Sequence, residues 1–368
     1  MHILQITREF PPAVLGGVSY HAYNLARQFV ERGHSVTVIT SNSTEYNTDG
    51  SEFYIDDIDI NQVNYSSNLS SRINFADRVV EYINNNYSSD SFDVVHSHEF
   101  IDFSKIELDA LMILKVHTNL CKKKEYMDAS QFPKYLRQLA LYFGDYFLWS
   151  REKKLEQKSL STSDKRIYIS KLVKYIYQKE YNFEESKKEN EIIHNGVDPS
   201  RFYPDHDHDS YWLFVGGTSK RKGYNNLIQS IANTNINIKI VGNYDTAKVH
   251  KNIENIEYLG RVDQDKLTDL YQNSKGLIHP ANYEPFGNVV LESLASGRPV
   301  IISSAEYCGA AEIIDGNIGM KINPNNHLSI KNTLQKADSL TFSIQDCRSV
   351  ARDYTWKKTA NRTLKYMY

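Results

Sequence analysis

The sequence predicts an α/β protein made of two Rossmann-like, doubly wound domains. Its 368 residues are more than one hydrophobic core usually serves, so two domains are expected. Short apolar runs alternate with helical patterns in two successive series, as in parallel sheets covered by helices. We expect domains over residues 1–195 and 196–352 and a closing helical segment over 353–368.

The first series begins with a strand and a glycine turn. Gly16 and Gly17 separate this strand from a helix expected over 18–31. His98 and His117 come at the carboxyl ends of two later buried strands, which is the edge where parallel sheets bind ligands. The strands expected in this domain are 2–6, 35–40, 93–96 and 110–116.

The second series follows the segment 193–198, which reads Ile-His-Asn-Gly-Val-Asp. Helical patterns separate its apolar runs, as a second doubly wound sheet requires. The pattern after Tyr354 predicts a last helix that reaches Tyr368. The strands expected in this domain are 211–216, 236–241, 256–259, 276–279 and 300–302.

Composition is that of a globular protein from a reducing compartment. Hydrophobic residues make up 40% of the chain and charged residues 24%, and the mean hydropathy is −0.53. No apolar run reaches the roughly 18 residues of a membrane span. The chain opens directly on a strand, and Cys121, Cys308 and Cys347 have neither metal-ligand nor disulfide spacing. We therefore expect a cytoplasmic protein.

Positive charge is concentrated in one region, although the net charge of −2 argues against bulk nucleic-acid binding. Residues 115–179 hold fifteen basic and six acidic residues. Such a surface can lie peripherally on the inner face of an anionic membrane, or it can approach an anionic acceptor. The alternative is a solvated helical face whose aromatic residues enter the core. The region includes Lys122, Lys123, Lys124, Arg151, Lys153, Lys154, Tyr135, Tyr142, Phe143, Tyr146, Phe147 and Trp149.

The segment 283–292 carries two carboxylates eight positions apart. Its proline and glycine disfavour helix before them, so the next helix should begin near Gly287. The unpaired N–H groups and positive dipole end of that helix suit a diphosphate, which the missing side chain of Gly287 lets come close. The residues assigned to this turn are Pro285, Phe286, Gly287, Asn288 and Val289.

Each of the two glutamates has an expected partner. Glu292, four residues after Asn288, shares its helix face and can accept hydrogen bonds from two hydroxyls of a ribose. Glu284 precedes the helix and is expected near a sugar. The alternative is that Glu284 is a loop charge and Glu292 a solvated helix residue.

Flanking residues make the pattern specific. His279-Pro280-Ala281 precedes it, and Gly297-Arg298-Pro299 leads into a buried strand. The segment resembles the E-x7-E signature of retaining glycosyltransferases of the GT-B fold, in particular the large family 4. The N-G-V-D segment 195–198 and the last helix also fit, so the resemblance covers essentially the whole chain. Glu312 matches a family G-x-x-E segment that shapes the pocket, with capping or solvation as the competing role.

The resemblance assigns the two domains and several residues. It implies an N-terminal acceptor-side domain and a C-terminal nucleotide-sugar domain that face a central cleft, with a last helix that crosses back to the first domain. His98 matches the family histidine that faces the donor sugar, although a structural role is the alternative, and both roles stay open for His117. Gly16 and Gly17 would let backbone amides approach the donor phosphates, although a plain tight turn explains them equally well. Val262 stands where relatives read the base through backbone groups.

A loop in the second series carries the expected cations. Gly216 and Gly217 open it, and Lys222 is chosen to neutralise charge on a leaving diphosphate. The family usually has Arg directly after the first glycine, and this chain has Gly217 there. Either Arg221 or Lys220 replaces that charge, or the site is impaired, and a solvated charge run is a further alternative.

The resemblance implies transfer of a hexosyl-type group from a UDP- or GDP-sugar to a hydroxyl of a glycan, glycolipid or other acceptor, with retention of the anomeric configuration. Lys222 and Arg221 would stabilise the leaving diphosphate, while Glu284 and His98 orient the sugar. Family members generally need no divalent metal and no other cofactor. The acidic segment Asp56-Asp57-Ile58-Asp59 lies in the polar stretch 46–71, which is expected to be irregular.

Other functions remain possible interpretations of the same sequence. A non-catalytic GT-B protein would bind a nucleotide or a partner without transferring sugar, and Gly217 favours this alternative. A sugar-nucleotide epimerase of similar architecture would isomerise the donor. A dinucleotide-linked dehydrogenase is disfavoured because the chain has no G-x-G-x-x-G motif after its first strand.

Overall fold

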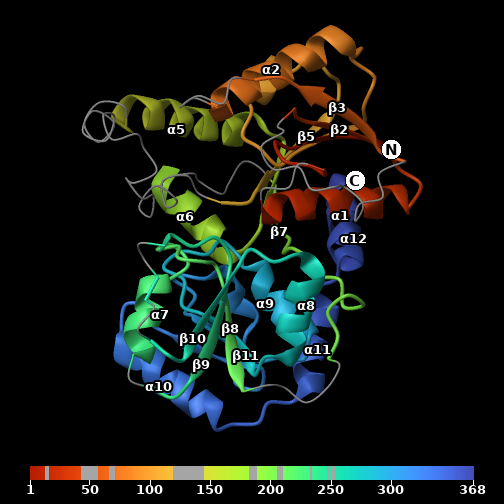
Figure 1. Cartoon of the computed structure of the whole chain (residues 1–368). Helices are drawn as coiled ribbons and strands as arrows, with labels where there is room; N and C mark the ends of the chain where they lie inside the picture. Colours follow the sequence, from red (N-terminus) through yellow and green to blue (C-terminus); the bar gives the residue numbers. More distant parts are fainter. Residues whose placement is uncertain are drawn as a thin grey trace. The chain divides into compact units, whose positions relative to one another are not determined.

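The structure of the chain is a computed structural model that divides into two compact units, whose elements are labelled in Figure 1. Unit 1 comprises Met1–Ile169, Val173–Ile193 and Thr359–Tyr368, and unit 2 comprises Ser170–Leu172 and His194–Lys358. The expected boundaries were 195 and 352. The structure describes all residues except 13–15, 43–56, 66–70, 119–144, 182–188, 205–209, 233, 247–248 and 251–252.

Unit 1 is built on a parallel sheet of seven strands. Across the sheet their order is β3 (Asp59–Val63), β2 (Ser35–Ser41), β1 (His2–Ile6), β4 (Val94–Ser97), β5 (Leu111–Val116), β6 (Lys165–Tyr168) and β7 (Asn190–Ile192). The chain order reverses between β1 and β4, which pair in parallel. Such a reversal makes the carboxyl ends of the two strands the usual ligand-binding edge.

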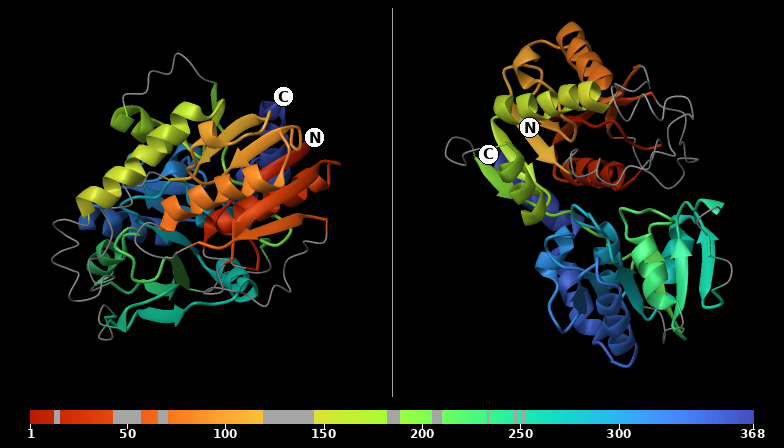
Figure 2. Two further views of the ribbon diagram at one scale, coloured as in Figure 1. Left: turned by 90° about the horizontal axis from the view of Figure 1, so that it is seen from above. Right: turned by 90° about the vertical axis from the view of Figure 1, so that its left-hand side faces the viewer.

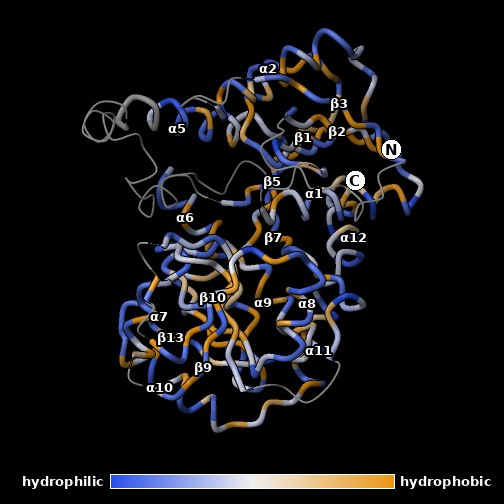
Figure 3. Tube along the Cα trace, viewed as in Figure 1, coloured by the Kyte–Doolittle hydropathy of each residue, from blue (hydrophilic) through white to orange (hydrophobic). Residues whose placement is uncertain are grey.

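Helices from both ends of the chain cover this sheet. α1 (Gly17–Val30) and α12 (Trp356–Met367) contribute Phe29 and Leu364 to one core, together with Val94 of the sheet. Apolar residues of the strands and of the helix faces that cover them are orange in Figure 3. Further helices among the described residues of this half of the chain are α2 (Ser71–Asn86), the short η1 (Phe103–Lys105), α5 (Asp145–Thr162) and α6 (Lys171–Tyr181).

Unit 2 repeats the same design with six parallel strands. Their order is β10 (Ile256–Gly260), β9 (Asn237–Val241), β8 (Tyr211–Val215), β11 (Gly276–His279), β12 (Val300–Ser303) and β13 (Gly319–Ile322). α7 (Tyr224–Ile231) and α10 (His327–Asp338) lie together on one side of the sheet, and α8 (Gln264–Asn273), α9 (Asn288–Ala295) and α11 (Ile344–Asp353) lie on the other (Figures 1 and 2). The prediction of two doubly wound α/β domains is therefore confirmed.

One expectation about local structure is wrong in part. The polar stretch 46–71 was expected to be irregular, but it contains β3, which begins at Asp59 and pairs in parallel with β2. β3 is an edge strand, so its polar side chains need not be buried, and backbone pairing to one neighbour is enough to form it. The parts of this stretch over 46–56 and 66–70 lie outside the described residues.

The basic and aromatic region is described only in part. Arg151 and Lys154 are exposed on α5, whereas Lys122–Lys124, Tyr135, Tyr142 and Phe143 lie outside the described residues. None of the described helices combines the length and the apolar character that a membrane crossing requires. Contact with a membrane surface stays a prediction. Cys308 and Cys347 are free and buried, and Cys121 lies outside the described residues.

Candidate functional site

Two loops at the carboxyl edge of the unit 2 sheet bring the predicted cations to the first predicted carboxylate. The first loop runs from Gly216 to Gly223 after β8, and the second runs from Pro280 to Gly287 after β11. β8 and β11 are paired parallel strands at the position where the strand order reverses, so their following loops lie side by side. Arg221 and Tyr283 join the loops, because the Tyr283 carbonyl oxygen accepts a 3.0 Å hydrogen bond from the guanidinium group.

Glu284 is the centre of a cluster of charged and polar groups. Its Oε2 pairs with the ammonium group of Lys222, lies 3.8 Å from a guanidinium nitrogen of Arg221 and lies 3.2 Å from Nε2 of His279. The Glu284 side chain is only 9% exposed. It is therefore not a solvated loop charge, which was the alternative to a role in the site.

Burial and charge act in opposite directions on this cluster. Burial alone would raise the pKa of Glu284, but Lys222, His279 and Arg221 together hold that pKa well below its ordinary value. Burial lowers the pKa of His279, which leaves the imidazole neutral and able to donate its Nε2–H to the carboxylate. Burial also lowers the pKa of Lys222, and the negative charge of Glu284 opposes this change. The site thus holds an ionised carboxylate beside two cationic side chains.

The backbone of the Glu284 segment is held in place by the segment that follows β12. The Glu284 N–H donates to the carbonyl of Tyr307 at 2.7 Å, and the Gly309 N–H donates to the carbonyl of Glu284 at 2.9 Å. The Ala310 N–H donates to the carbonyl of Phe286, also at 2.9 Å. These three bonds hold the backbone around Glu284 and do not involve the carboxylate oxygens. Those oxygens therefore stay available to the cations and to a ligand.

α9 begins at Asn288, close to the position predicted from the sequence. Gly287 is the residue that caps it, with φ of 104°, a left-handed conformation that favours glycine, and with no side-chain capping bond. The Asn288 side chain accepts a 2.8 Å hydrogen bond from the Asn195 amide. Gly287 has no side chain that could accept hydrogen bonds from the first turn of α9. The backbone N–H groups of that turn, next to Glu284, therefore suit a bound anion.

Glu292 lies one turn further along α9 and has a partner that the sequence did not suggest. Tyr271 of α8 donates a 2.8 Å hydrogen bond to Glu292 Oε2. Burial raises the pKa of this carboxyl group, and the bond from Tyr271 opposes that rise. Because Tyr271 occupies Oε2, the other carboxylate oxygen is the one with more capacity to accept a ribose hydroxyl.

Gly217 stands where the family usually has arginine, and the surrounding backbone leaves no room for a side chain there. Gly217 has a left-handed φ of 57°, and a Cβ added there would lie 1.8 Å from the Asn243 carbonyl oxygen. No larger residue fits this turn without moving its backbone. Of the two candidates for the replacing charge, Arg221 reaches the Glu284 cluster, whereas Lys220 is exposed.

Val262 and Glu312 are two further residues of unit 2 that the sequence predicts in the site. Val262 follows β10 and is half-buried, and no contact of the described structure tests its expected role near the base. Glu312 belongs to η6 (Gly309–Ile313) and is not a solvated charge. Its Oε1 lies 2.5 Å from His194 Nε2, and its Oε2 accepts a 3.3 Å hydrogen bond from the Lys171 N–H. Glu312 therefore joins segments distant in sequence within unit 2.

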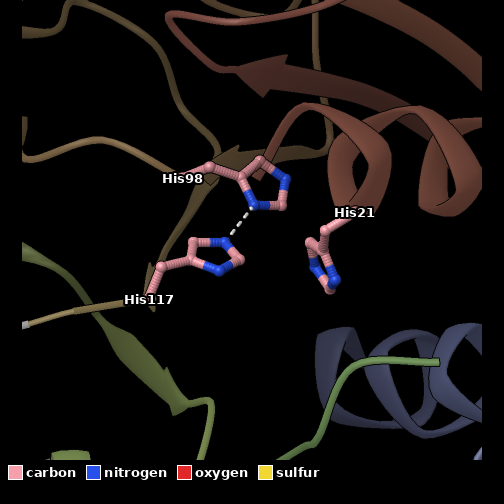
Figure 4. A group of neighbouring side chains, drawn as sticks. All are labelled: His21, His98 and His117. Carbon is pink, nitrogen blue, oxygen red and sulfur yellow. Dashed lines mark hydrogen bonds between the residues drawn. The ribbon is translucent and has the colours of Figure 1, made fainter. Parts of the chain in front are cut away.

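The remaining predicted residues lie in unit 1. Gly16 caps α1 and Gly17 is its first residue, with open space where a Gly16 side chain would be. His98 directly follows β4, and its Nδ1 lies 3.0 Å from Nε2 of His117, which directly follows β5 (Figure 4). His21 of α1 lies beside both rings and was missed by sequence reasoning, although its position in the first turns after Gly17 places it at the same sheet edge.

Glycosyltransferases are among the known proteins with similar sequences and folds. An uncharacterized glycosyltransferase of Methanocaldococcus jannaschii is 26% identical, over 99% of this chain and 97% of its own length. The solved structure of sucrose-phosphate synthase from Thermosynechococcus elongatus is 16% identical and has a TM-score of 0.76, with 99% of this chain and 98% of that chain covered. Anabaena HepE, solved with UDP and glucose, is 13% identical with a TM-score of 0.67, covering 100% and 99% of the two chains.

Two family models match the chain and together span most of it. The model described as Glycosyltransferase Family 4 matches residues 15–201, and the model described as Glycosyl transferases group 1 matches residues 200–348. The fold of both units, the strand order and these matches agree with one another. The chain belongs to glycosyltransferase family 4 and has the GT-B fold.

Proposed function

We propose that this glycosyltransferase moves a hexosyl group from a UDP- or GDP-sugar to a hydroxyl of a glycan, glycolipid or other conjugate, with retention of the anomeric configuration. The observation that carries the proposal is the position of Glu284. Its ionised carboxylate lies between Lys222, Arg221 and His279 and directly precedes the N-terminus of α9. Positive side chains and helix N–H groups next to one carboxylate suit a sugar diphosphate, which has a polar sugar at one end and a charged diphosphate at the other.

The cations and the helix terminus would act on the leaving group. As the bond from the anomeric carbon to the diphosphate oxygen breaks, both electrons leave with the oxygen, and negative charge grows on the nucleoside diphosphate. That charge is stabilised by the side chains of Lys222 and Arg221 and by the backbone amides from Phe286 to Val289. Gly216 and Gly217 belong to the other loop of the site. The acceptor hydroxyl attacks from the same face and passes its proton to the leaving phosphate, so mass and charge balance without an enzyme nucleophile.

The other end of the donor is assigned to the remaining site residues. Glu292 accepts hydrogen bonds from the ribose, and Glu284 holds the transferred sugar. His98, Gly16 and Gly17 of unit 1 keep the roles that the family pattern implies for them, and these roles are predictions. The side chains of Lys222 and Arg221 supply positive charge at the diphosphate, so we propose that transfer needs no divalent metal cofactor.

The UDP bound to the neighbouring Anabaena structure makes UDP-sugars the first donors to test. The purified chain is incubated with a panel of UDP-, GDP- and ADP-sugars in a chelating buffer, and the free nucleoside diphosphate is measured over time. Release with at least one donor, slowed about 100-fold or more in a Lys222→Ala variant, is the expected result. Thermal stabilisation by a nucleotide without any turnover would instead favour a non-catalytic binding protein. Isomerised donor without free diphosphate would show an epimerase.

A further inference from the structure

A cluster of three histidines in unit 1 has no role as a set in the proposed reaction. His21 comes from α1, and His98 and His117 directly follow β4 and β5. Their rings converge on one space (Figure 4), and one ring nitrogen from each lies within 4.8 Å of the other two. The three side chains are 0%, 5% and 8% exposed, respectively. His98 and His117 are joined by a hydrogen bond, and the ring of His21 lies edge-on to both of their rings.

We propose that His21, His98 and His117 bind one divalent transition metal ion, such as Zn²⁺. Nδ1 of His98 and Nε2 of His117 are 3.0 Å apart. Two nitrogens bound to one tetrahedral Zn²⁺ at bond lengths of 2.0–2.1 Å lie about 3.3 Å apart, so these two already have nearly the required separation. A ring nitrogen of His21 lies within 4.8 Å of a nitrogen of each of the other two, so the His21 ring has to move closer to bind the same ion. Three histidines leave a fourth coordination position for water.

The protonation of the rings favours a metal. Burial, and then the positive charge of neighbouring groups such as Lys115, lowers the pKa of all three imidazoles well below 6.5. Each ring is therefore neutral at physiological pH and offers a lone pair, which is the form that coordinates a metal ion.

Gln5 provides the support that metal-binding histidines usually have. Its Nε2 lies 3.4 Å from His98 Nε2, on the side of the ring away from His117. Gln5 is fully buried, and its Oε1 has no hydrogen-bond partner among the described residues. Rotation of the amide by half a turn would place Oε1 where it accepts the Nε2–H of His98. That hydrogen bond leaves the Nδ1 lone pair of His98 for the metal and fixes the ring.

The bound ion would have a consequence for activity. His98 is the histidine that the proposed function assigns to the donor sugar, so an ion on its Nδ1 would restrict the ring and compete with that role. This consequence rests on the proposed function, whereas metal binding itself does not. We expect micromolar Zn²⁺ to inhibit donor turnover, and a chelator to restore it.

Cobalt provides a direct measurement of the site. The full-length protein is stripped with a chelator, dialysed and titrated with Co²⁺ in the absence of any nucleotide. We expect visible absorption of four- or five-coordinate Co²⁺ that saturates at one equivalent and is displaced by Zn²⁺. The variants His117→Gln and His21→Gln should lose this absorption, whereas His327→Gln, which changes an exposed histidine at the start of α10, should keep it.

Each outcome decides one question. Absent absorption in the wild type, or absorption that survives both His117→Gln and His21→Gln, would refute the site. If these variants fail to fold by circular dichroism, zinc X-ray absorption on the loaded wild type takes their place, and fewer than three imidazole neighbours would refute it. Saturable Co²⁺ binding in a protein that turns over no sugar nucleotide would support the metal site and contradict the proposed function.

Discussion

Glu284 and Lys222 neutralise each other in the structure, and this pairing has a consequence for substrate binding. A sugar diphosphate bound as we propose would add negative charge beside Lys222 and offer hydroxyl groups to Glu284. The ammonium group can then interact with both anions, and the carboxylate gains donors that strengthen its ionised form. Arg221 lies near enough to Glu284, at 3.8 Å, to share this task. The site thus already holds a carboxylate next to two cations before a donor binds.

The cations should affect turnover more than donor affinity. Lys222→Ala removes a charge that we propose stabilises the leaving diphosphate, and we expect kcat to fall about 100-fold or more, as when one oxyanion donor is lost. Arg221→Ala should act in the same direction. Lys220→Ala is the matched control, because Lys220 belongs to the same loop but is exposed, and it should change kcat less than about twofold. A Lys222→Ala variant that alters only donor affinity would rule out the leaving-group role.

The pH dependence of nucleotide binding should report on Glu292. Burial raises the pKa of this carboxyl group, so it takes up a proton at a higher pH than an exposed glutamate does. The protonated form accepts fewer hydrogen bonds from a ribose. Nucleotide affinity should therefore fall as the pH decreases through the raised pKa, and calorimetric titrations at a series of pH values measure this. Glu292→Gln, which cannot ionise, should bind weakly at every pH and remove that dependence.

Gly217 makes a prediction about stability. Gly217→Ala puts a Cβ at 1.8 Å from the Asn243 carbonyl in a left-handed turn. The backbone strain alone costs about 1–3 kcal/mol, and the clash adds to it, so Tm should fall by several degrees. Gly16→Ala is the matched control for stability, since its Cβ would meet nothing within 4 Å. Equal thermal stability of the two variants would show that the turn relaxes easily.

At the scale of the elements, the site depends on backbone hydrogen bonds between the loop that contains Glu284 and the segment that follows β12. Glu284 and Phe286 bond through their backbones to the segment 307–310, and Glu284 also forms a parallel β-bridge with Cys308. This arrangement explains why a segment containing proline and glycine keeps one conformation at the start of α9. The sequence predicted the start of α9 correctly, because Pro285 and Gly287 are local signals, but the supporting contacts are distant in sequence and have no local signal.

Gly309 tests this support. Its Cβ would lie 2.1 Å from the Pro285 carbonyl oxygen, so Gly309→Ala should push the Glu284 loop away from its position. We expect both donor affinity and kcat to decrease by about tenfold or more, because small displacements of catalytic groups are costly. Gly316→Ala, with open space around the added Cβ, is the control for glycine replacement. Unchanged kinetics in a folded Gly309→Ala protein would show that segment 307–310 does not position Glu284.

The strands that sequence reasoning missed are mostly at sheet edges. β3, β7 and β13 each pair on one side only, and they carry exposed or half-buried polar residues such as Asp59 and Lys321. β6 lies inside the sheet but begins with Lys165 and Arg166, which hide its apolar pattern. The central strands were predicted because both of their faces are buried, and burial leaves a continuous apolar run.

For the whole molecule, the class of fold and the family could be predicted from the sequence, since periodicity and the 283–292 motif are both local in the chain. The arrangement within the site could be predicted only in part. Whether Arg221 or Lys220 faces Glu284 depends on the conformation of the loop that contains them, and the role of Tyr271 depends on helix packing. The His21 contribution to the histidine cluster likewise required three-dimensional contacts between α1 and two strand ends.

The most direct test of the central claim is calorimetric titration of UDP, GDP and ADP into the wild-type protein and into Glu292→Ala. The account predicts that at least one nucleotide binds the wild type and that Glu292→Ala weakens this binding at least about tenfold, which corresponds to about 1.4 kcal/mol. It would be contradicted if none of the three nucleotides bound the folded wild type, or if Glu292→Ala bound its nucleotide with unchanged affinity.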